Sequence, residues 1–282
     1  MSKLKHEFTV VLVSYKSRQK ISKLINKFKK KIKIIIIENS NDRFLQKKFL
    51  NYKNINFYFP IKNKGFAAGL NLGLKKANTK YILYLDIDTK INVQQIFKLY
   101  NKAKKISNFG VITTKIKNQD YSNLILGKDK KTSLSYVSFN TGCVMFFNRK
   151  NFINLGGFDE NYFLYFEEAD FYLRSIKANK KIFLYEDVIV EHEGMSSIDK
   201  LYKKKYDLLR SWHYCWSKFY FYRKHYNYLF AFVKTIPNLT RSIKGIFKNL
   251  INADFYKMKL HLVELKGLSA AYLRLNSYYR MK

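Results

Sequence analysis

The chain has 282 residues, of which 47% are hydrophobic and 17% aromatic, and this composition excludes an intrinsically disordered protein. Its 54 Lys and Arg residues outnumber 20 Asp and Glu residues, and the net charge of +34 indicates attraction to nucleotides, nucleic acid or an anionic membrane face. Codon bias of an A/T-rich genome is an alternative source of part of this charge, because Lys, Asn, Ile, Tyr and Phe are all abundant.

The N-terminal part of the chain alternates between apolar runs and helical periodicity. Residues 8–15, 32–37 and 56–59 are short apolar runs that predict buried strands, and the spacing of apolar residues in 16–31 and 44–50 predicts helices. Polar residues follow the strands. This order predicts an α/β fold in which crossover helices connect parallel strands.

A turn of small residues, 63–73, opens a helix that is predicted to end near residue 77. Glycines let a backbone approach a ligand closely, and the N-terminus of a helix favours an anion. The stretch matches neither the phosphate loop nor the dinucleotide-binding pattern. A helix that packs tightly on the sheet explains the glycines equally well.

The next strand, residues 81–85, is apolar and ends in two carboxylates, Asp86 and Asp88. Open α/β sheets bind their ligands at the carboxyl ends of strands. Two carboxylates from one turn can hold a hard divalent cation against a diphosphate. The alternative is an ordinary surface turn, since Asp is common where strands end.

The middle of the chain is predicted to contain a helix at 93–105, a strand at 111–114, a strand at 137–148 and a short helix at 152–155. Residues 115–135 are polar and irregular. A loop of that length inside a domain is usually functional or mobile.

A second acidic cluster, Glu167, Glu168 and Asp170, lies among aromatic and aliphatic residues. Crowded carboxylates raise the pKa of at least one member, which makes a general base near neutral pH. On a helix, Glu167 and Asp170 would share a face, and Arg174 would lie one turn beyond Asp170. An exposed acidic helix start is the structural alternative.

Residues 181–185 and 188–190 are predicted to be closing strands that lead to His192. This histidine lies at a strand end, as Asp88 does. Imidazole can complete the ligand shell of a divalent cation of the Mn type, although a single histidine is more often structural.

The tail, residues 201–282, is denser in positive charge than the rest of the chain and interleaves aromatic with basic residues. Helices of this composition bind membrane interfaces, but a helical subdomain with a solvated basic face is an alternative. Pro237 is predicted to separate two helices, and residues 257–279 a third. No stretch is long and apolar enough to predict a membrane-spanning helix, and residues 1–7 lack a signal-peptide pattern.

Cys143 and Cys215 are the only cysteines, and their separation predicts neither a zinc site nor a disulfide framework. A reducing, cytoplasmic setting fits this usage.

Six stretches in order carry a resemblance to a known family: residues 11–15, 38–40, 63–71, 85–89, 157–160 with 165–170, and His192. In these the chain resembles family 2 glycosyltransferases of the GT-A fold, most closely the rhamnosyltransferase-like bacterial members. The resemblance implies a mixed, mainly parallel sheet flanked by helices over residues 1–200. The C-terminal helical, basic and amphipathic region, 201–282, is expected to associate with a membrane.

The resemblance also implies a nucleotide-diphospho-sugar donor and a divalent cation, Mn or Mg. The residues expected to bind the donor are Ser14, Tyr15, Glu38, Asn39, Lys64, Gly65, Asn71, Asp86 and Ile87. The expected metal ligands are Asp88, His192 and Asp86, and a histidine ligand favours Mn. The metal would neutralise the leaving diphosphate.

Members of this family invert the anomeric centre by direct displacement, which needs one base on the acceptor hydroxyl. That base is usually the Asp of a Glu-Asp pair, and here its position is taken by Glu168. Glu38 likewise stands where Asp is commoner. The choice of base among Glu168, Glu167 and Asp170 therefore stays open.

We expect an inverting, metal-dependent transferase that moves rhamnose or a similar hexose from a UDP- or dTDP-sugar to a lipid-linked glycan in cell-surface polysaccharide synthesis. The expected location is cytoplasmic, peripheral on the inner face of the cell membrane. A nucleic-acid-binding protein would explain the charge but not the spaced carboxylates, so nucleic acid is not the expected partner. A nucleotidyltransferase with a similar sheet is a third alternative.

Overall fold

The computed structural model of the protein describes residues 7–30, 32–129, 132–194 and 197–280. The expectation for residues 1–7 therefore falls almost wholly outside the described residues. The chain divides into two compact units. The first contains residues 1–64, 68–159 and 168–199, and the second contains residues 200–282 together with two short segments, 65–67 and 160–167.

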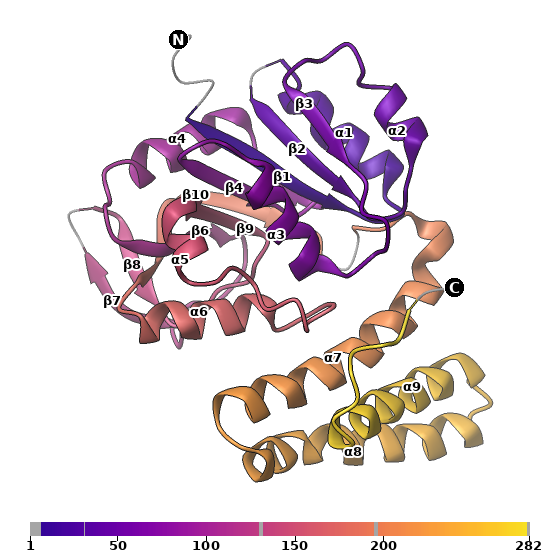
Figure 1. Ribbon diagram of the computed structural model, residues 1–282. Coiled ribbons are helices and arrows are strands. Elements are labelled where there is room, and N and C mark those ends of the chain that lie inside the picture. Colours follow the sequence, from indigo (N-terminus) through magenta and orange to yellow (C-terminus); the bar gives the residue numbers. More distant parts are fainter. Residues whose placement is uncertain (1–6, 31, 130–131, 195–196, 281–282) are drawn as a thin grey trace. The chain divides into compact units, whose positions relative to one another are not determined.

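The first unit is built on a mixed sheet (Figure 1). Its strands are β1 (Phe8–Ser14), β2 (Lys33–Glu38), β3 (Ile55–Tyr58), β4 (Tyr81–Leu85), β5 (Thr89–Lys90), β6 (Phe109–Ile116), β7 (Ile125–Asp129), β8 (Leu134–Val137), β9 (Val144–Asn148) and β10 (Lys181–His192). Their order is β3-β2-β1-β4-β9-β6-β10-β8-β7, with β5 paired to β10 outside this path. Because β5, β8 and β9 run opposite to the other described strands, the sheet is mixed, as expected.

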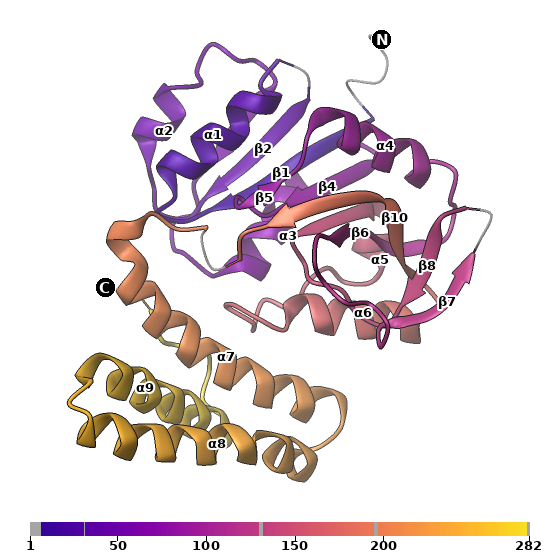
Figure 2. The ribbon, with the colours of Figure 1, turned by 180° about the vertical axis from the view of Figure 1, so that it is seen from behind.

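Helices cover both faces of this sheet (Figures 1 and 2). They are α1 (Arg18–Phe28), α2 (Arg43–Lys47), α3 (Phe66–Lys76), α4 (Val93–Ala103), α5 (Arg149–Asn154) and α6 (Glu167–Lys177). Apolar residues of α1 and α4 pack on one face in a core that includes Phe8, Val10 and Leu12. The alternate residue Val11 points to the other face, towards α3.

Three expectations for the middle of the chain were wrong. Residues 125–137, expected to be irregular or partly strand, contain the antiparallel strands β7 and β8. The strand expected at 137–148 is interrupted, because β8 ends at Val137 and β9 begins at Val144. The two closing strands are one, β10, which has a register shift between Tyr185 and Ile189. Short polar strands and bulges lack a clear apolar alternation, so periodicity does not reveal them.

The second unit contains α7 (Lys203–His225), α8 (Tyr228–Ile251) and α9 (Phe255–Tyr272), preceded by a short 3₁₀ turn at Lys200–Tyr202. Each of these helices packs against the other two. Their core includes Trp212, Trp216 and Phe219 from α7. Within the part of the chain that the structure describes, no helix is both long and apolar enough to cross a membrane.

Pro237 does not separate two helices, because α8 continues through it. A proline lacks the N–H that would bond to the carbonyl one turn earlier. Here Pro237 lies on the exposed side of α8, where water can satisfy that carbonyl. The last helix also ends earlier than expected, at Tyr272.

Candidate functional site

Asp86, Asp88 and His192 meet at the carboxyl ends of β4 and β10. The backbone N–H of Asp86 donates to the carbonyl of Cys143, 2.8 Å away, which ties the end of β4 to the start of β9. The strand β5 follows at once and pairs with β10 so that Thr89 lies opposite His192. This pairing places His192 beside Asp88, although the two residues are 104 positions apart in the sequence.

The three side chains are close enough to share one ion. His192 Nε2 lies 3.3 Å from Asp86 Oδ2 and 3.2 Å from Asp88 Oδ1. One possible ligand atom from each residue lies within 4.8 Å of the others. The Asp88 side chain is buried, whereas that of Asp86 is 31% exposed. Hydrogen bonds that the imidazole donates to Asp86 first and then to Asp88 raise the pKa of His192 to about 10.

The chemistry of this donor set suits a divalent cation. Two carboxylates and an imidazole are ligands for Mn²⁺, and carboxylates also suit Mg²⁺. The hydroxyl of Tyr84 donates to the Asp86 carboxylate and orients it from the same face of β4. The residues present therefore fit the metal that the sequence predicted.

The second acidic cluster forms the first turn of α6, but its members have different surroundings. Asp170 is fully buried, and its carboxylate accepts from Arg174 Nε at 2.8 Å. The same guanidinium donates to the carbonyls of Leu155 and Gly157, so this pair joins α6 to the preceding loop. Asp170 thus has a structural role that explains its charge.

Glu168 lies close to Gly142, a residue that has no side chain. A Cβ added at Gly142 would lie 3.5 Å from both Cβ and Cγ of Glu168. Tyr172 lies one turn further along α6, and its pKa is raised. Burial is the main cause, and the negative charge of Glu168 is the second. Glu167, the first residue of α6, is 5% exposed and belongs to the second unit. The geometry thus favours Glu168 over Asp170 as the base, and the role itself stays a prediction.

Sequence reasoning missed the strained backbone just before these residues. Tyr165 and Phe166 have φ values of 70° and 69°, a left-handed region that bulky residues rarely adopt. Within the second unit, Arg210 donates to the Tyr165 hydroxyl, and the rings of both residues pack against Tyr214 of α7. No propensity signals such a conformation, because tertiary contacts hold it.

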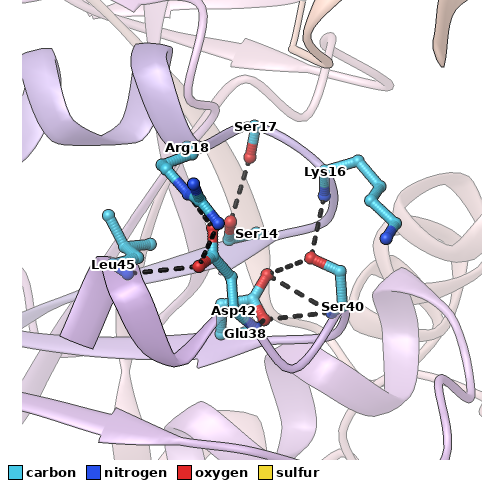
Figure 3. Close-up of polar contacts among 8 residues, drawn as sticks. All are labelled: Ser14, Lys16, Ser17, Arg18, Glu38, Ser40, Asp42 and Leu45. Atoms are coloured by element: carbon cyan, nitrogen blue, oxygen red, sulfur yellow. Dashed lines mark hydrogen bonds and ion pairs between the residues drawn. The ribbon is translucent and has the colours of Figure 1, made fainter. Parts of the chain in front are cut away.

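Glu38 turns its carboxylate into its own loop (Figure 3). It accepts from the backbone N–H of Ser40 at 3.1 and 3.2 Å, from the Ser40 hydroxyl at 2.5 Å and from the N–H of Asp42 at 2.5 Å. Asp42 in turn pairs with Arg18 and caps α2 through the N–H of Leu45. Glu38 therefore organises the loop after β2, and any contact with a nucleotide base stays a prediction.

The other residues expected at the donor lie at several places. Ser14 is buried and bonds to the Ser17 hydroxyl at 2.9 Å, while Tyr15 and Asn39 are partly exposed at the ends of β1 and β2. Lys64 is exposed. Ile87 belongs to the hydrophobic core, which is a sufficient reason for its apolar side chain.

The glycine-rich stretch has clear packing roles. Gly65 has a φ of 98°, and a Cβ there would lie 2.2 Å from the carbonyl oxygen of Phe163 within the second unit. Gly73 lets α3 approach β1, since a Cβ there would meet Val11 at 2.4 Å. Asn71 exchanges two hydrogen bonds of 2.9 Å with the backbone of Phe158. Tight packing thus accounts for these residues without a ligand.

Comparison with known proteins assigns more than half of the chain to one family. The model of glycosyl transferase family 2 matches residues 9–178, a segment that contains Asp86, Asp88 and Glu168 and ends before His192. The hexosyltransferase Agl10 of low-salt glycan biosynthesis in Haloferax volcanii is 23% identical over 197 residues. That alignment covers 62% of this chain and 64% of the relative, so the chain spans less than two thirds of that protein's length.

Solved structures share the fold. The Pyrobaculum calidifontis mannosyltransferase PcManGT, in complex with GDP-Man and Mn²⁺, has a TM-score of 0.59 at 12% identity, over 94% of this chain and 86% of that one. S. aureus TarS 1–349 in complex with UDP has a TM-score of 0.55 at 16% identity, over 97% and 93%. Such identities establish only a common fold. Because the family model itself matches more than half of the chain, the protein belongs to glycosyl transferase family 2.

Proposed function

We propose that this protein is an inverting, divalent-metal-dependent glycosyltransferase that uses a UDP- or dTDP-sugar. The observation that carries the proposal is the meeting of Asp86, Asp88 and His192 at the carboxyl edge of the sheet in a family 2 chain. The complex of PcManGT with GDP-Man and Mn²⁺ has a related fold and supports the donor class. A divalent cation held by the three residues would supply positive charge against the leaving diphosphate.

Glu168 is proposed as the base. It takes the proton of the acceptor hydroxyl while that oxygen forms a bond to the anomeric carbon of the sugar. The bond from the same carbon to the diphosphate oxygen breaks on the opposite side, so the configuration inverts in one step. Asp170 is unsuited to this role because Arg174 holds its buried carboxylate.

The acceptor is proposed to be a hydroxyl of a lipid-linked glycan in the synthesis of a cell-surface polysaccharide. The similarity to a hexosyltransferase of glycan biosynthesis supports a hexose and a glycan. Rhamnose rests only on the resemblance of the sequence motifs. The proposed location is the inner face of the cell membrane, which agrees with the net charge of +34.

The donor is tested by the melting temperature of the purified protein with UDP, dTDP, GDP or CMP, each with Mn²⁺, Mg²⁺ or a chelator. Ligands that bind only the folded state raise the melting temperature. We expect UDP or dTDP to raise it only in the presence of the metal. The absence of any shift with these nucleotides, together with a shift by single-stranded nucleic acid, would contradict the proposal and favour a nucleic-acid-binding protein.

A further inference from the structure

Helix α8 in the second unit carries its large apolar side chains on the outside. We define the α8 ridge as the exposed apolar residues that recur at intervals of three, four or seven positions along the helix, together with the last residue of the helix: Leu229, Val233, Ile236, Ile243, Phe247, Leu250 and Ile251. This spacing places them on one side of an α-helix. Phe247 is 63% exposed and Ile251 is 84% exposed. In a helix that faces water, such residues would normally lie inside.

The inward side of α8 is small and polar. Its buried residues are Ala231, Thr235, Asn238, Ser242 and Asn249. These polar groups have partners within the second unit: Asn238 accepts from Lys218 at 2.6 Å, and Ser242 donates to Glu264 at 2.6 Å. The orientation of α8 is therefore fixed by specific hydrogen bonds. Rotating the helix to bury the ridge would break them.

A cationic groove runs beside the ridge, between the C-terminal half of α8 and the start of α9. It has a volume of about 920 Å³. The residues that line it are Thr240, Arg241, Lys244, Gly245, Lys248, Asn249, Asn252, Asp254, Lys257 and His261. Asp254 is the one carboxylate among them, and it pairs with Lys257 at 2.9 Å. Lys244 and Lys248 are exposed, and they add positive charge to a groove rich in hydrogen-bond donors.

The charges distinguish between the possible occupants of this surface. Helix α8 has four charged residues, Lys234, Arg241, Lys244 and Lys248, and all of them are cations. A symmetric contact with a second copy would bring these cations face to face, which disfavours self-association. An anionic bilayer is complementary to this surface, because its acyl chains can cover the ridge while its phosphates neutralise the lysines.

We propose that the α8 ridge inserts into the interface of an anionic phospholipid bilayer and that the cationic groove binds the phosphates of its lipids. The helix then lies in the plane of the membrane and does not span it. This inference deepens the membrane location in the proposed function and rests on it for its biological role. Lipid binding itself requires neither donor nor metal, so the two proposals can fail separately.

The test is sedimentation of the full chain with vesicles of phosphatidylcholine, with and without phosphatidylglycerol. The variant Phe247→Ser/Ile251→Ser should lose at least about tenfold in binding to the anionic vesicles, because buried apolar area contributes strongly to interfacial binding. The matched control is Ile61→Ser/Leu126→Ser, which removes two exposed apolar side chains of the first unit. It should bind as the parent protein does.

A second pair of variants tests the groove. Lys244→Glu/Lys248→Glu should lower binding by about tenfold or more at low salt, since each basic residue near an anionic surface contributes about fivefold in affinity. The control Lys104→Glu/Lys105→Glu makes the same change of charge on the first unit and should have a smaller effect. Binding to phosphatidylcholine alone should be weak for all proteins.

Three results would overturn the inference. The first is unchanged vesicle binding by both the ridge variant and the groove variant. The second is that the parent protein is a dimer by light scattering and does not bind vesicles, whereas the ridge variant is a monomer. The third is equal affinity of the groove for soluble glycerol phosphate and for vesicles. In each case a metal-dependent shift with UDP or dTDP would leave the proposed transferase intact.

Discussion

The two units of this protein place polarity in opposite ways. In the first unit the central strands β1, β2 and β4 are buried and mainly apolar, and the carboxylates Asp86 and Asp88 follow β4 at its carboxyl end. In the second unit α8 buries small polar residues and exposes large apolar ones. Apolar character therefore marks the inside of the sheet but the outside of this helix. The spacing of apolar residues shows that a helix is amphipathic. Only the elements that pack against the helix decide which side faces inward.

The helices of the second unit differ among themselves for the same reason. The aromatic residues of α7, which suggested a membrane-binding face, include Trp212 and Trp216 in the core of the unit. The helical subdomain considered as an alternative thus describes α7. The apolar surface lies instead on α8, whose inward residues are committed to hydrogen bonds.

The largest expected effect is a loss of turnover when a carboxylate at the carboxyl edge of the sheet is removed. Asp88→Asn removes a carboxylate from the proposed metal site, and a loss of several kcal/mol in transition-state stabilisation corresponds to at least about a thousandfold in turnover. The measurement is release of nucleoside diphosphate from the donor, together with the melting temperature of the variant. The variant should remain folded.

The control for this variant is Glu191→Gln, a carboxylate of β10 that pairs with Lys117 and Lys90 at the surface. It lies next to His192 in sequence and should retain nearly full turnover. If Glu191→Gln and Asp88→Asn were equally impaired, general loss of negative charge would explain the result and the metal role would be discarded.

The first turn of α6 offers the next comparison, between a base and a structural carboxylate. Glu168→Gln should lower kcat by about a hundredfold or more while the nucleotide still stabilises the protein, because only proton transfer is lost. Asp170→Asn should instead lower the free energy of unfolding by about 3 kcal/mol, since it breaks a buried pair with Arg174. Rate and denaturation measurements on both variants distinguish the two roles. Selective loss of kcat in Asp170→Asn alone would show that the base was assigned wrongly.

Within the second unit, a core aromatic and a ridge aromatic should respond differently. Trp212 is fully buried, so Trp212→Ala should lower the free energy of unfolding by about 3–5 kcal/mol. Phe247→Ser removes an exposed ring and should leave unfolding by denaturant nearly unchanged in the absence of lipid. A strong destabilisation by Phe247→Ser would mean that the ridge is part of the core.

The smallest effect is expected in the dependence of stability on pH. Burial lowers the pKa of His213 to about 3, and its ring nitrogens bond to the Tyr279 carbonyl at 2.9 Å and to the Ser277 hydroxyl at 3.1 Å. Below its ordinary pKa of about 6.5, the unfolded chain binds a proton that the folded chain does not. The contribution of His213 to stability should therefore be constant above pH 7 and fall by roughly 1 kcal/mol per pH unit as the pH drops from about 6.5 towards 4.

The matched variant for this prediction is His213→Gln, which retains a hydrogen-bonding amide but does not titrate. The measurement is the thermal stability of both proteins between pH 4 and 8. The other titratable groups contribute equally to both proteins, so their contributions cancel in the difference. The difference in stability should diminish as the pH falls. Parallel curves would show that His213 has the same pKa in the folded and unfolded states, which would contradict the prediction.

Much of the first unit follows from local pattern alone. The buried strands up to β4, the helices α1, α3 and α4 and the position of Asp86 and Asp88 at a strand end were predictable, because apolar periodicity and strand ends are local properties of a sequence. The β7–β8 hairpin was not, since its residues carry no strong alternation. The inward orientation of the Glu38 carboxylate also depends on a loop whose shape no local rule predicts.

The sequence by itself determined the family and the fold class, and it predicted which residues would meet a donor and a metal, since these signals lie in short motifs. Tertiary structure alone decided that β5 pairs with β10 and brings His192 to 3.2 Å from Asp88. It also decided which side of α8 faces outward. Pairing register and helix orientation are set by contacts between residues far apart in the chain, and local periodicity carries no record of them.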